Sequence, residues 1–435
     1  MKKYWAVLIA AVMTVGMLSA CSSKGTGGSA GDGGKPKGEI TVWGWNVAAS
    51  SMELAVDQFQ KKYPDVKVKV QDIGRLDLYD KLTVGLAANG AGLPDVLMVE
   101  SDRLDNYKKQ FPKGFMDLSE KGFDQYEDKF GKSKIATAKN KDGKFIAMPW
   151  DIGPTGVFYR TDLFEKAGVD PKSIETWDDF IEAGKVIKEK TNAAMVPVDI
   201  AKDDALYRMM LNQQSAFYFD EKGNIDFQSE ESVKAMSMIQ KLQENKLIAN
   251  VDGWDGTVTA TVNGTVATVP FGVWYTGTIM EQAKDLEGKW DVMQLPAFEK
   301  GGNRNANLGG SDIVIPAASK NKEAAYAFAE FFTTDKDTQV NVLKKYGIFP
   351  SLLETYEDKY FDEPVAFFNN QPIFRMFADE VKDIPAANYT NDYPRGLKYA
   401  ADAQAAALLD MKDPAEVLKA AADQLANESK REINK

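Results

Sequence analysis

Residues 148–160 read MPWDIGPTGVFYR and join two short apolar strands, 145–148 and 156–159. The join contains a Trp-Asp pair set among glycines and prolines, which interrupt helices. Such a join predicts a crossing of the chain between two lobes. Trp150 offers a flat apolar face and Asp151 an acceptor carboxylate. We therefore predict that this stretch is a hinge and part of the floor of a binding cleft.

The Trp-Asp pair has the chemistry needed to hold a sugar ring, which presents an apolar face and several hydroxyl groups. This hypothesis predicts that Trp150→Ala and Asp151→Ala each weaken binding by about tenfold or more while the fold stays intact.

The overall composition is that of an ordinary globular chain. It has 435 residues, of which 44% are hydrophobic and 27% charged, enough for two lobes with their own cores. The formal net charge is −11, and removing the two lysines of the leader described below takes it to −13. Because phosphate binding needs clustered Lys and Arg, and no long basic run follows the leader, we expect no nucleic-acid partner.

Two residue types are conspicuous by their scarcity. The sequence has no histidine, which excludes Ser-His-Asp, Cys-His and His-ligated metal chemistry. Its only cysteine is Cys21, so the folded body has no disulfide, thiol nucleophile or thiolate metal site. No Asp-rich calcium loop is visible. We therefore expect no enzyme, no cofactor and no metal, although ligation of a metal by carboxylates alone stays open.

The N-terminus is typical of export. Residues 1–20 have a basic start and an apolar run, which predicts a signal peptide. The segment LSAC at 18–21 resembles the lipobox of bacterial lipoproteins, in which the cysteine, here Cys21, is lipid-modified. The alternative is an ordinary signal peptide with a chance cysteine. Residues 22–38 are rich in Gly and Ser and predict a flexible tether with a span of roughly 23 Å.

The body begins with alternating strand and helix patterns, as in an α/β layer fold. Strands are predicted at 40–45, 66–70 and 95–99, with helices between them, the second at about 76–88. Helices dominate the rest. Their predicted starts include Thr176 with Asp179, a capping-box-like pair, and Asp413 followed by Pro414. No transmembrane segment is predicted after the leader.

Candidate site residues follow two of these strands: Trp45, Asn46, Glu100, Asp102 and Arg103. Ligands bind at the carboxyl ends of strands in such sheets. For Trp45 and Asn46 the cleft and the core are equally good positions, whereas Trp43 is predicted to be core. The acidic group at 100–103 has an equal alternative, a solvated helix start capped by Ser101 or Asp102.

A second aromatic group lies between 251 and 295. Trp254 is predicted to lie in a turn, and Trp274 and Tyr275 at a strand-to-helix junction that suits the mouth of a cleft. Trp290, at a strand start, is predicted to be core. Further on, Gly309, Gly310 and Ser311 precede a strand at 312–315; the glycines allow close backbone approach but are also ordinary turn residues.

From residue 39 onward the chain resembles the extracellular solute-binding proteins of bacterial carbohydrate ABC importers, the maltose-binding-protein-like family 1. The resemblance rests on an ordered set of segments: the strand 40–45, GLPDV at 92–96, MPWD at 148–151 with FYR at 158–160, TWDDF at 176–180, LGGS at 308–311 and IP at 315–316.

The resemblance implies an α/β, two-lobed periplasmic-binding-protein-like fold of type II, with a ligand cleft between the lobes. The chain would cross between the lobes three times, near 149–154, 303–308 and 348–351. The implied lobes are 39–150 with 308–348, and 151–307 with 349–435.

The resemblance also implies which residues contact the ligand. The matching positions are Trp45, Asn46, Glu100, Asp102, Arg103, Trp150, Asp151, Trp274, Tyr275, Gly309, Gly310 and Ser311, with a looser match at Trp254. Tyr389 and Arg395 of the C-terminal helices are further candidates for the cleft.

The implied function is capture of a carbohydrate, with an oligosaccharide favoured over a monosaccharide, and its delivery to the permease subunits of an ABC importer. The protein would be a monomer, anchored through Cys21 at the extracellular face of the cell membrane. One alternative is a secreted carbohydrate-active enzyme that uses a carboxylate pair from Glu100, Asp102 and Asp151. Another is a binder of a non-sugar anion or peptide, which the acidic, aromatic cleft disfavours.

Overall fold

The computed structural model describes residues 35–434. Cys21, the predicted signal peptide and all of the predicted tether before residue 35 lie outside the described residues. Within the described part, no helix is both long enough and apolar enough to span a membrane.

Ten strands and fifteen α-helices are described, with short 3-10 turns between them. The strands are β1 Gly38–Gly44, β2 Val66–Asp72, β3 Val96–Glu100, β4 Met148–Pro149, β5 Thr155–Arg160, β6 Val196–Val198, β7 Ile248–Asn250, β8 Thr268–Gly272, β9 Trp290–Gln294 and β10 Ser311–Val314. The helices are α1 Asn46–Lys62, α2 Arg75–Ala87, α3 Ser101–Gln110, α4 Lys132–Ala138, α5 Thr161–Ala167, α6 Trp177–Thr191, α7 Ala205–Gln213, α8 Glu230–Glu244, α9 Gly253–Val262, α10 Tyr275–Gln282, α11 Lys322–Thr334, α12 Lys336–Tyr346, α13 Ile373–Glu380, α14 Tyr393–Leu409 and α15 Pro414–Ser429.

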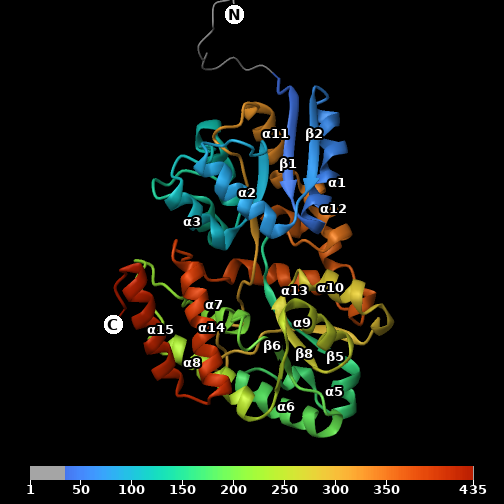
Figure 1. The fold of residues 1–435 in the computed structure, drawn as a ribbon. Coiled ribbons are helices and arrows are strands. Elements are labelled where there is room, and N and C mark those ends of the chain that lie inside the picture. Colours follow the sequence, from blue (N-terminus) through green and yellow to red (C-terminus); the bar gives the residue numbers. More distant parts are fainter. Residues whose placement is uncertain (1–34, 435) are drawn as a thin grey trace, which may run out of the picture. The chain divides into compact units, whose positions relative to one another are not determined.

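The first lobe is built on a five-stranded sheet in the order β2-β1-β3-β10-β4. β1 pairs in parallel with β2 and β3, and β10 is antiparallel to both β3 and β4. β1 and β2 stand side by side with α1 next to them (Figure 1). Because β10 comes from residues 311–314, a late segment of the chain completes the sheet begun by the first hundred residues.

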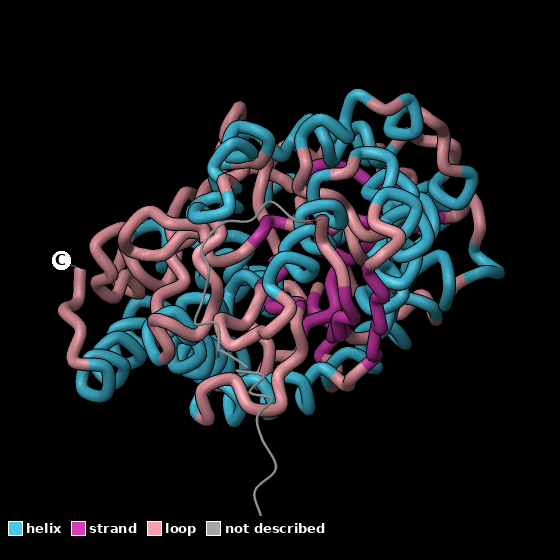
Figure 2. The backbone as a smooth tube through the Cα atoms, turned by 90° about the horizontal axis from the view of Figure 1, so that it is seen from above, coloured by secondary structure: helices cyan, strands magenta, loops and turns pink. Residues whose placement is uncertain are grey.

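The second lobe is built on two smaller sheets. The strand order β8-β5-β9 is antiparallel, and β6 pairs in parallel with β7. Seen from above, helices and loops surround most of the strands of the molecule (Figure 2). The two-lobed α/β fold expected from the sequence is therefore confirmed, and the strands and helices predicted before residue 100 are present.

Each lobe has its own buried core. The core of the first lobe draws on the segment from Ile40 to Trp150 and on the later segment from Ile313 to Phe332. The second lobe's core residues come mainly from the intervening and the C-terminal segments. α12, predicted to belong to the first lobe, contributes Val342 to that core but Val340 and Leu343 to the second. The precise lobe bounds remain a prediction.

The segment 150–154 is hydrogen bonded to two segments far from it in the sequence, 306–311 and 349–351. Ile152 N–H donates to the Phe349 carbonyl at 3.1 Å, and Leu308 N–H donates to the Gly153 carbonyl at 2.8 Å. Asp151 forms an antiparallel bridge with Pro350. These three segments coincide with the three predicted crossings, and we call them the hinge segments.

Local sequence explains the helix starts well. Thr176 Oγ1 accepts a hydrogen bond from Asp179 N–H, and the Asp179 carboxylate accepts one from Thr176 N–H, which completes the predicted capping box. Asp413 caps α15 by accepting from Glu416 N–H. Trp290 is fully buried and Trp43 is 8% exposed, as predicted for core residues.

Candidate functional site

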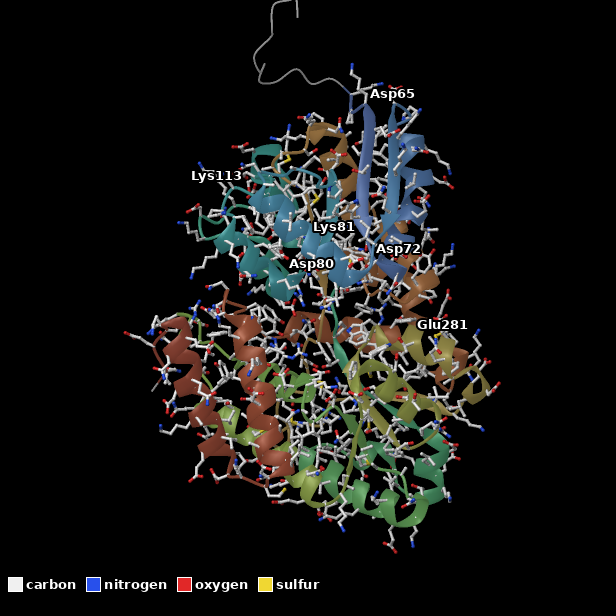
Figure 3. The ribbon with its side chains drawn as sticks, in the orientation of Figure 1. Asp65, Asp72, Asp80, Lys81, Lys113 and Glu281 are labelled. Carbon is white, nitrogen blue, oxygen red and sulfur yellow. The ribbon has the colours of Figure 1, made fainter. Side chains whose placement is uncertain are left out.

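The carboxyl ends of β1, β2 and β3 form one edge of the first sheet. In the parallel register Gly44 lies beside Asp72, and β3 ends at Glu100, which pairs with Ser311 of β10. Figure 3 shows Asp65 and Asp72 at opposite ends of β2, and Asp72 marks the carboxyl edge. The edge therefore gathers residues from four strands, as expected for a ligand site in such a sheet.

Two predicted residues follow β1 at this edge. Trp45 is half-buried and lies with its ring 5.8 Å from that of Tyr79. Asn46 is exposed and has a φ of +47°, while its N–H donates to Asp72 Oδ1 at 3.0 Å. The aromatic face of Trp45 and the amide of Asn46 are thus both held at the carboxyl edge.

Glu100 is the centre of a charged cluster. Both oxygens of its carboxylate share the single Arg75 Nε–H, each at 3.0 Å, and the carboxylate also accepts from Arg75 Nη2 at 2.6 Å and from Arg103 Nε at 3.1 Å. Tyr79 OH also donates to Glu100, and the Arg103 guanidinium lies 4.3 Å from the centre of the Tyr79 ring. Because two arginines neutralise Glu100, this carboxylate is held in place as an ion-pair partner.

Asp102 lies in the first turn of α3 with a buried oxygen. The helix starts at Ser101 with Glu100 as its N-cap and no side-chain cap bond, so capping by Ser101 or Asp102 is wrong. Asp102 Oδ1 is buried and has no hydrogen-bond partner among the described residues. Burial, together with the negative charge of Glu100, raises the pKa of Asp102 to about 6. An unpaired buried carboxylate oxygen is costly, which singles out Asp102 as a candidate ligand contact.

An aromatic wall, formed by Trp254, Phe271, Trp274 and Tyr275, belongs to the second lobe. The ring centres of Trp254 and Trp274 are 5.9 Å apart, and those of Phe271 and Trp274 are 5.0 Å apart. Trp254 is 47% exposed and lies in the first turn of α9, so the turn predicted for it is wrong. Trp274 is half-buried and its indole N–H donates to the Leu308 carbonyl at 2.7 Å, which ties the wall to a hinge segment.

Tyr275 does not present its ring to a ligand. It is fully buried, and its hydroxyl is 2.8 Å from Thr261 Oγ1. The stacking role predicted for Tyr275 is therefore wrong, because α10 begins at this residue and turns the ring into the core beneath Trp254 and Phe271.

The stacking role predicted for Trp150 is also wrong. Its side chain is 1% exposed and packs in the core of the first lobe, with its ring centre 5.2 Å from that of Phe332. The hinge position was predicted correctly, but β4 and β10 point the indole into the core and leave no face for a ligand.

Asp151 serves the hinge. It is 8% exposed, and its Oδ1 accepts a hydrogen bond from Ser311 N–H at 2.7 Å. Burial raises its pKa to about 6, while the nearby positive charge of Lys134 opposes that rise. Lys134 is itself buried, 2.6 Å from Asp312 Oδ1 and bonded to Ser101 Oγ at 2.7 Å. The predicted contact of the Asp151 carboxylate with a ligand is therefore replaced by a contact within the hinge.

The two hinge glycines take conformations that suit glycine. Gly309 and Gly310 have φ values of +96° and +104°. A Cβ on Gly310 would stand 3.0 Å from the Asp151 carbonyl oxygen, so the backbones approach closely, as predicted. Ser311 is 5% exposed and begins β10. These residues hold the hinge segments together, and their contact with a ligand remains a prediction.

The sequence did not single out Arg208, which belongs to α7. It sits 2.9 Å from Asp204 Oδ1 and donates to Tyr393 OH at 2.9 Å. The Arg208 side chain is 19% exposed, and no motif in the sequence marked it. Tyr389 is half-buried, with its ring centre 5.1 Å from that of Tyr393, and its contact with a ligand remains a prediction.

Arg395 lies farther along α14, in a groove of about 470 Å³ between α3 and α14. It is 55% exposed and pairs with Asp392 at 2.6 Å. In the same groove Lys109 Nζ donates to Asn391 Oδ1 at 2.9 Å, a direct hydrogen bond between the lobes. The other lining residues are Asn106, Gln110 and Pro394.

The family model of the bacterial extracellular solute-binding proteins matches residues 44–339. The chain belongs to this family. Members bind solutes and are not enzymes, so the expectation of a binding protein is confirmed and the alternative of a secreted carbohydrate-active enzyme is excluded. Among the described residues of this solute-binding protein, no cluster of acidic residues is arranged to hold a metal ion.

Two relatives of this solute-binding protein are named for the sugars that they bind. It is 34% identical to the lactose-binding protein of Rhizobium radiobacter over 403 residues, covering 90% of this chain and 93% of that one. It is 29% identical to the arabinooligosaccharide-binding protein of Bacillus subtilis over 400 residues, covering 88% and 89% of the two chains.

Solved structures are similar in fold. The binding protein associated with an ABC transporter of B. animalis subsp. lactis, solved with β-1,6-galactobiose, is 25% identical with a TM-score of 0.74, covering 90% of this chain and 97% of that one. The sugar-binding protein MalE of Xanthomonas citri is 19% identical with a TM-score of 0.76, covering 90% and 98%, which supports the fold alone.

Proposed function

We propose that this solute-binding protein captures a carbohydrate, an oligosaccharide, for an ABC importer. The observation that carries the proposal is the pairing of an aromatic wall around the exposed Trp254 with a polar edge around Glu100, Asp102 and Arg103. The wall belongs to the second lobe and the edge to the first.

This combination suits a sugar because the two surfaces supply different contacts. Trp254 and Trp274 offer ring faces against which a pyranose or furanose can stack. Trp45, Glu100, Asp102 and Arg103 add a further indole and charged acceptors and donors for hydroxyl groups. Closure of the lobes would exclude water and bury most of the ligand, as pockets at lobe interfaces do.

Similarity to sugar-binding relatives supports the ligand class. The relatives named above bind lactose and arabinooligosaccharides, and a structural relative holds a galactobiose. Each of these three ligands contains more than one sugar unit. We infer that the cleft takes a di- or oligosaccharide, and that the predicted lobes, 39–150 with 308–348 and 151–307 with 349–435, move against each other about the hinge segments.

The proposal includes a lipid anchor at Cys21 on the extracellular face of the cell membrane, and a monomer that docks on permease subunits. A maltooligosaccharide solute-binding lipoprotein of Streptococcus pneumoniae, 25% identical over 413 residues, supports the anchor. Replacement of Cys21 by Ser should release the protein from the membrane into the medium. Retention of Cys21→Ser in the membrane fraction would count against the anchor.

The sugar assignment is tested by thermal denaturation and calorimetric titration of the purified body with lactose, arabinotriose, β-1,6-galactobiose and maltotriose. A sugar at 100 times its dissociation constant should stabilise the folded state by about 2.7 kcal/mol. Absence of any shift with all four, and with a wider oligosaccharide panel, would overturn the assignment.

A further inference from the structure

We propose that Lys134 is a positioning residue for the sugar site: it does not contact the ligand, but it fixes the start of α3, which carries the polar edge, to the second hinge segment. We call Lys134, Ser101 and Asp312, with the contacts among them, the Lys134 network. The inference rests on the proposed function, because it concerns the same site, and it adds a residue that the sequence motifs did not mark.

The ammonium group of Lys134 is buried and fully partnered. Lys134 belongs to α4 and is 4% exposed. Its Nζ donates to Ser101 Oγ at 2.7 Å and to the Ser311 carbonyl at 2.9 Å, and it forms an ion pair with Asp312 Oδ1 at 2.6 Å. An ammonium has three N–H donors, so these three oxygens leave none for a ligand. Lys134 can therefore act on a sugar only through the groups that it holds.

Ser101, the first residue of α3, is fixed by both its side chain and its backbone. Its hydroxyl accepts from Lys134 and donates to Asp312 Oδ2 at 2.7 Å. Asp312 is fully buried in β10. The Ser101 N–H donates to the Gly310 carbonyl at 3.0 Å. The start of α3 is thus tied at once to α4, to β10 and to the second hinge segment.

The candidate ligand residues lie directly beside these fixed atoms. Glu100 and Asp102 flank Ser101 in the sequence and belong to the polar edge. A Cβ on Gly310 would stand 3.7 Å from Lys134 Nζ, so the ammonium also lies close to the hinge glycine. A shift of the Lys134 network would therefore move the polar edge and the second hinge segment relative to each other.

A buried ion pair of this kind is better explained by geometry than by stability. Taking both charges out of water offsets most of their attraction, and apolar residues of similar volume often stabilise a core at least as well. Directed hydrogen bonds among buried groups supply fixed positions instead. A sugar site depends on such positions, because each hydroxyl group must meet a donor or an acceptor at hydrogen-bond distance.

The test measures dissociation constants by calorimetry for the wild type, for Ser101→Ala and for the double variant Lys134→Met/Asp312→Asn. The double variant removes both charges and nearly keeps the side-chain volumes, so it should fold, and melting temperatures without sugar check this. The probes are lactose, arabinotriose, β-1,6-galactobiose and maltotriose. We expect both variants to bind the preferred sugar about tenfold or more weakly, because the polar edge is no longer held in one position.

The matched control is Lys108→Met. Lys108 also ties α3 to α4, by donating to the carbonyls of Thr137 and Lys139 at 3.0 and 2.9 Å, but it lies about two turns beyond Ser101. Its replacement should lower the melting temperature and leave the sugar affinity within twofold of the wild type. A merely structural link between the two helices would give the same result in the control as in the Lys134 network.

An affinity within twofold of the wild type in either folded network variant would overturn the positioning role. Ser101→Ala decides the question if the double variant does not fold. An equal loss of affinity in Lys108→Met would also overturn the role, because any loosening of α3 would then suffice. Failure of the wild type to bind any probe would overturn the sugar assignment and the positioning role together, which distinguishes it from failure of the positioning role alone.

Discussion

Trp150 and Trp254 show how far the environment of an indole decides its role. Both are tryptophans next to an acidic residue or a glycine in the sequence, yet Trp150 is 1% exposed and Trp254 is 47% exposed. Trp150 packs against Phe332, whereas Trp254 stands at the outer end of the aromatic wall. The first indole therefore stabilises the first lobe, and the second is available to stack on a sugar ring.

This contrast predicts opposite effects of truncation. Trp254→Ala should weaken binding of the preferred sugar by about tenfold or more, because aromatic contact area is lost, and should change the melting temperature little. Trp150→Ala should lower the free energy of unfolding by about 3–5 kcal/mol through the cavity it leaves. Calorimetric titration and chemical denaturation measure the two quantities. Wild-type affinity in Trp254→Ala would show that the aromatic wall does not contact the ligand.

At the level of elements, the hinge segments depend on close backbone contact. A Cβ added to Gly153 would collide with the Leu308 carbonyl oxygen, and one added to Gly272 would stand 2.8 Å from the same backbone oxygen and collide with the Trp274 indole. Backbone cannot move aside as a flexible side chain can. The glycines at these two positions thus let the first crossing, the second crossing and the start of the aromatic wall lie in contact.

Gly153→Ala should therefore disturb the hinge. We expect a loss of about 1–3 kcal/mol in the free energy of unfolding, from overpacking against Leu308. Gly74→Ala is the matched control, because its added Cβ would meet only the Asp77 carboxylate at 3.9 Å and its φ is −50°. Denaturation by urea measures both variants. Equal free energies of unfolding for Gly153→Ala and Gly74→Ala would contradict this prediction, because they would show that the hinge segments 150–154 and 306–311 can move apart without loss of stability.

Across the whole molecule, several carboxyl groups are buried and protonate more readily in the folded state than in the unfolded chain. Burial raises the pKa of Asp102 and Asp151 to about 6 and that of Asp204 to about 7, and it raises the pKa of Glu380 as well. Asp151 belongs to a hinge segment, where its carboxylate accepts from Ser311 N–H.

These shifts predict that stability rises on mild acidification. Between about pH 4 and pH 7 the folded protein binds more protons than the unfolded chain, so the free energy of unfolding should increase as the pH falls from 8 to about 5. Below pH 4 stability should fall again, because pairing with Arg160 lowers the pKa of Asp162 despite partial burial, and the bond from Thr176 lowers that of Asp179.

Melting temperatures measured from pH 4 to pH 8 test this dependence. Asp151→Asn should show a shallower rise between pH 8 and pH 5 than the wild type, because its hinge carboxyl no longer titrates. A melting temperature that increases steadily from pH 5 to pH 8 would contradict the prediction.

Most of the architecture was accessible from local pattern. Hydrophobic periodicity located the strands and helices before residue 100, and cap residues located the starts of α6 and α15, because these signals act within a few residues. The carboxyl-edge rule brought Trp45 and Glu100 to one place, since parallel strands end together. The glycine and proline content of 148–160 correctly marked a hinge segment.

The sequence by itself determined a two-lobed α/β binding protein without histidine chemistry, and the approximate positions of its hinge segments. Only the tertiary structure decided which side of each element faces outward, and therefore that Trp150, Asp151 and Tyr275 are buried while Trp254 is exposed. It also brought Arg208 of α7 into a hydrogen bond with Tyr393 of α14. The physical reason is that burial and charge pairing depend on contacts between segments far apart in the chain, which no local pattern records.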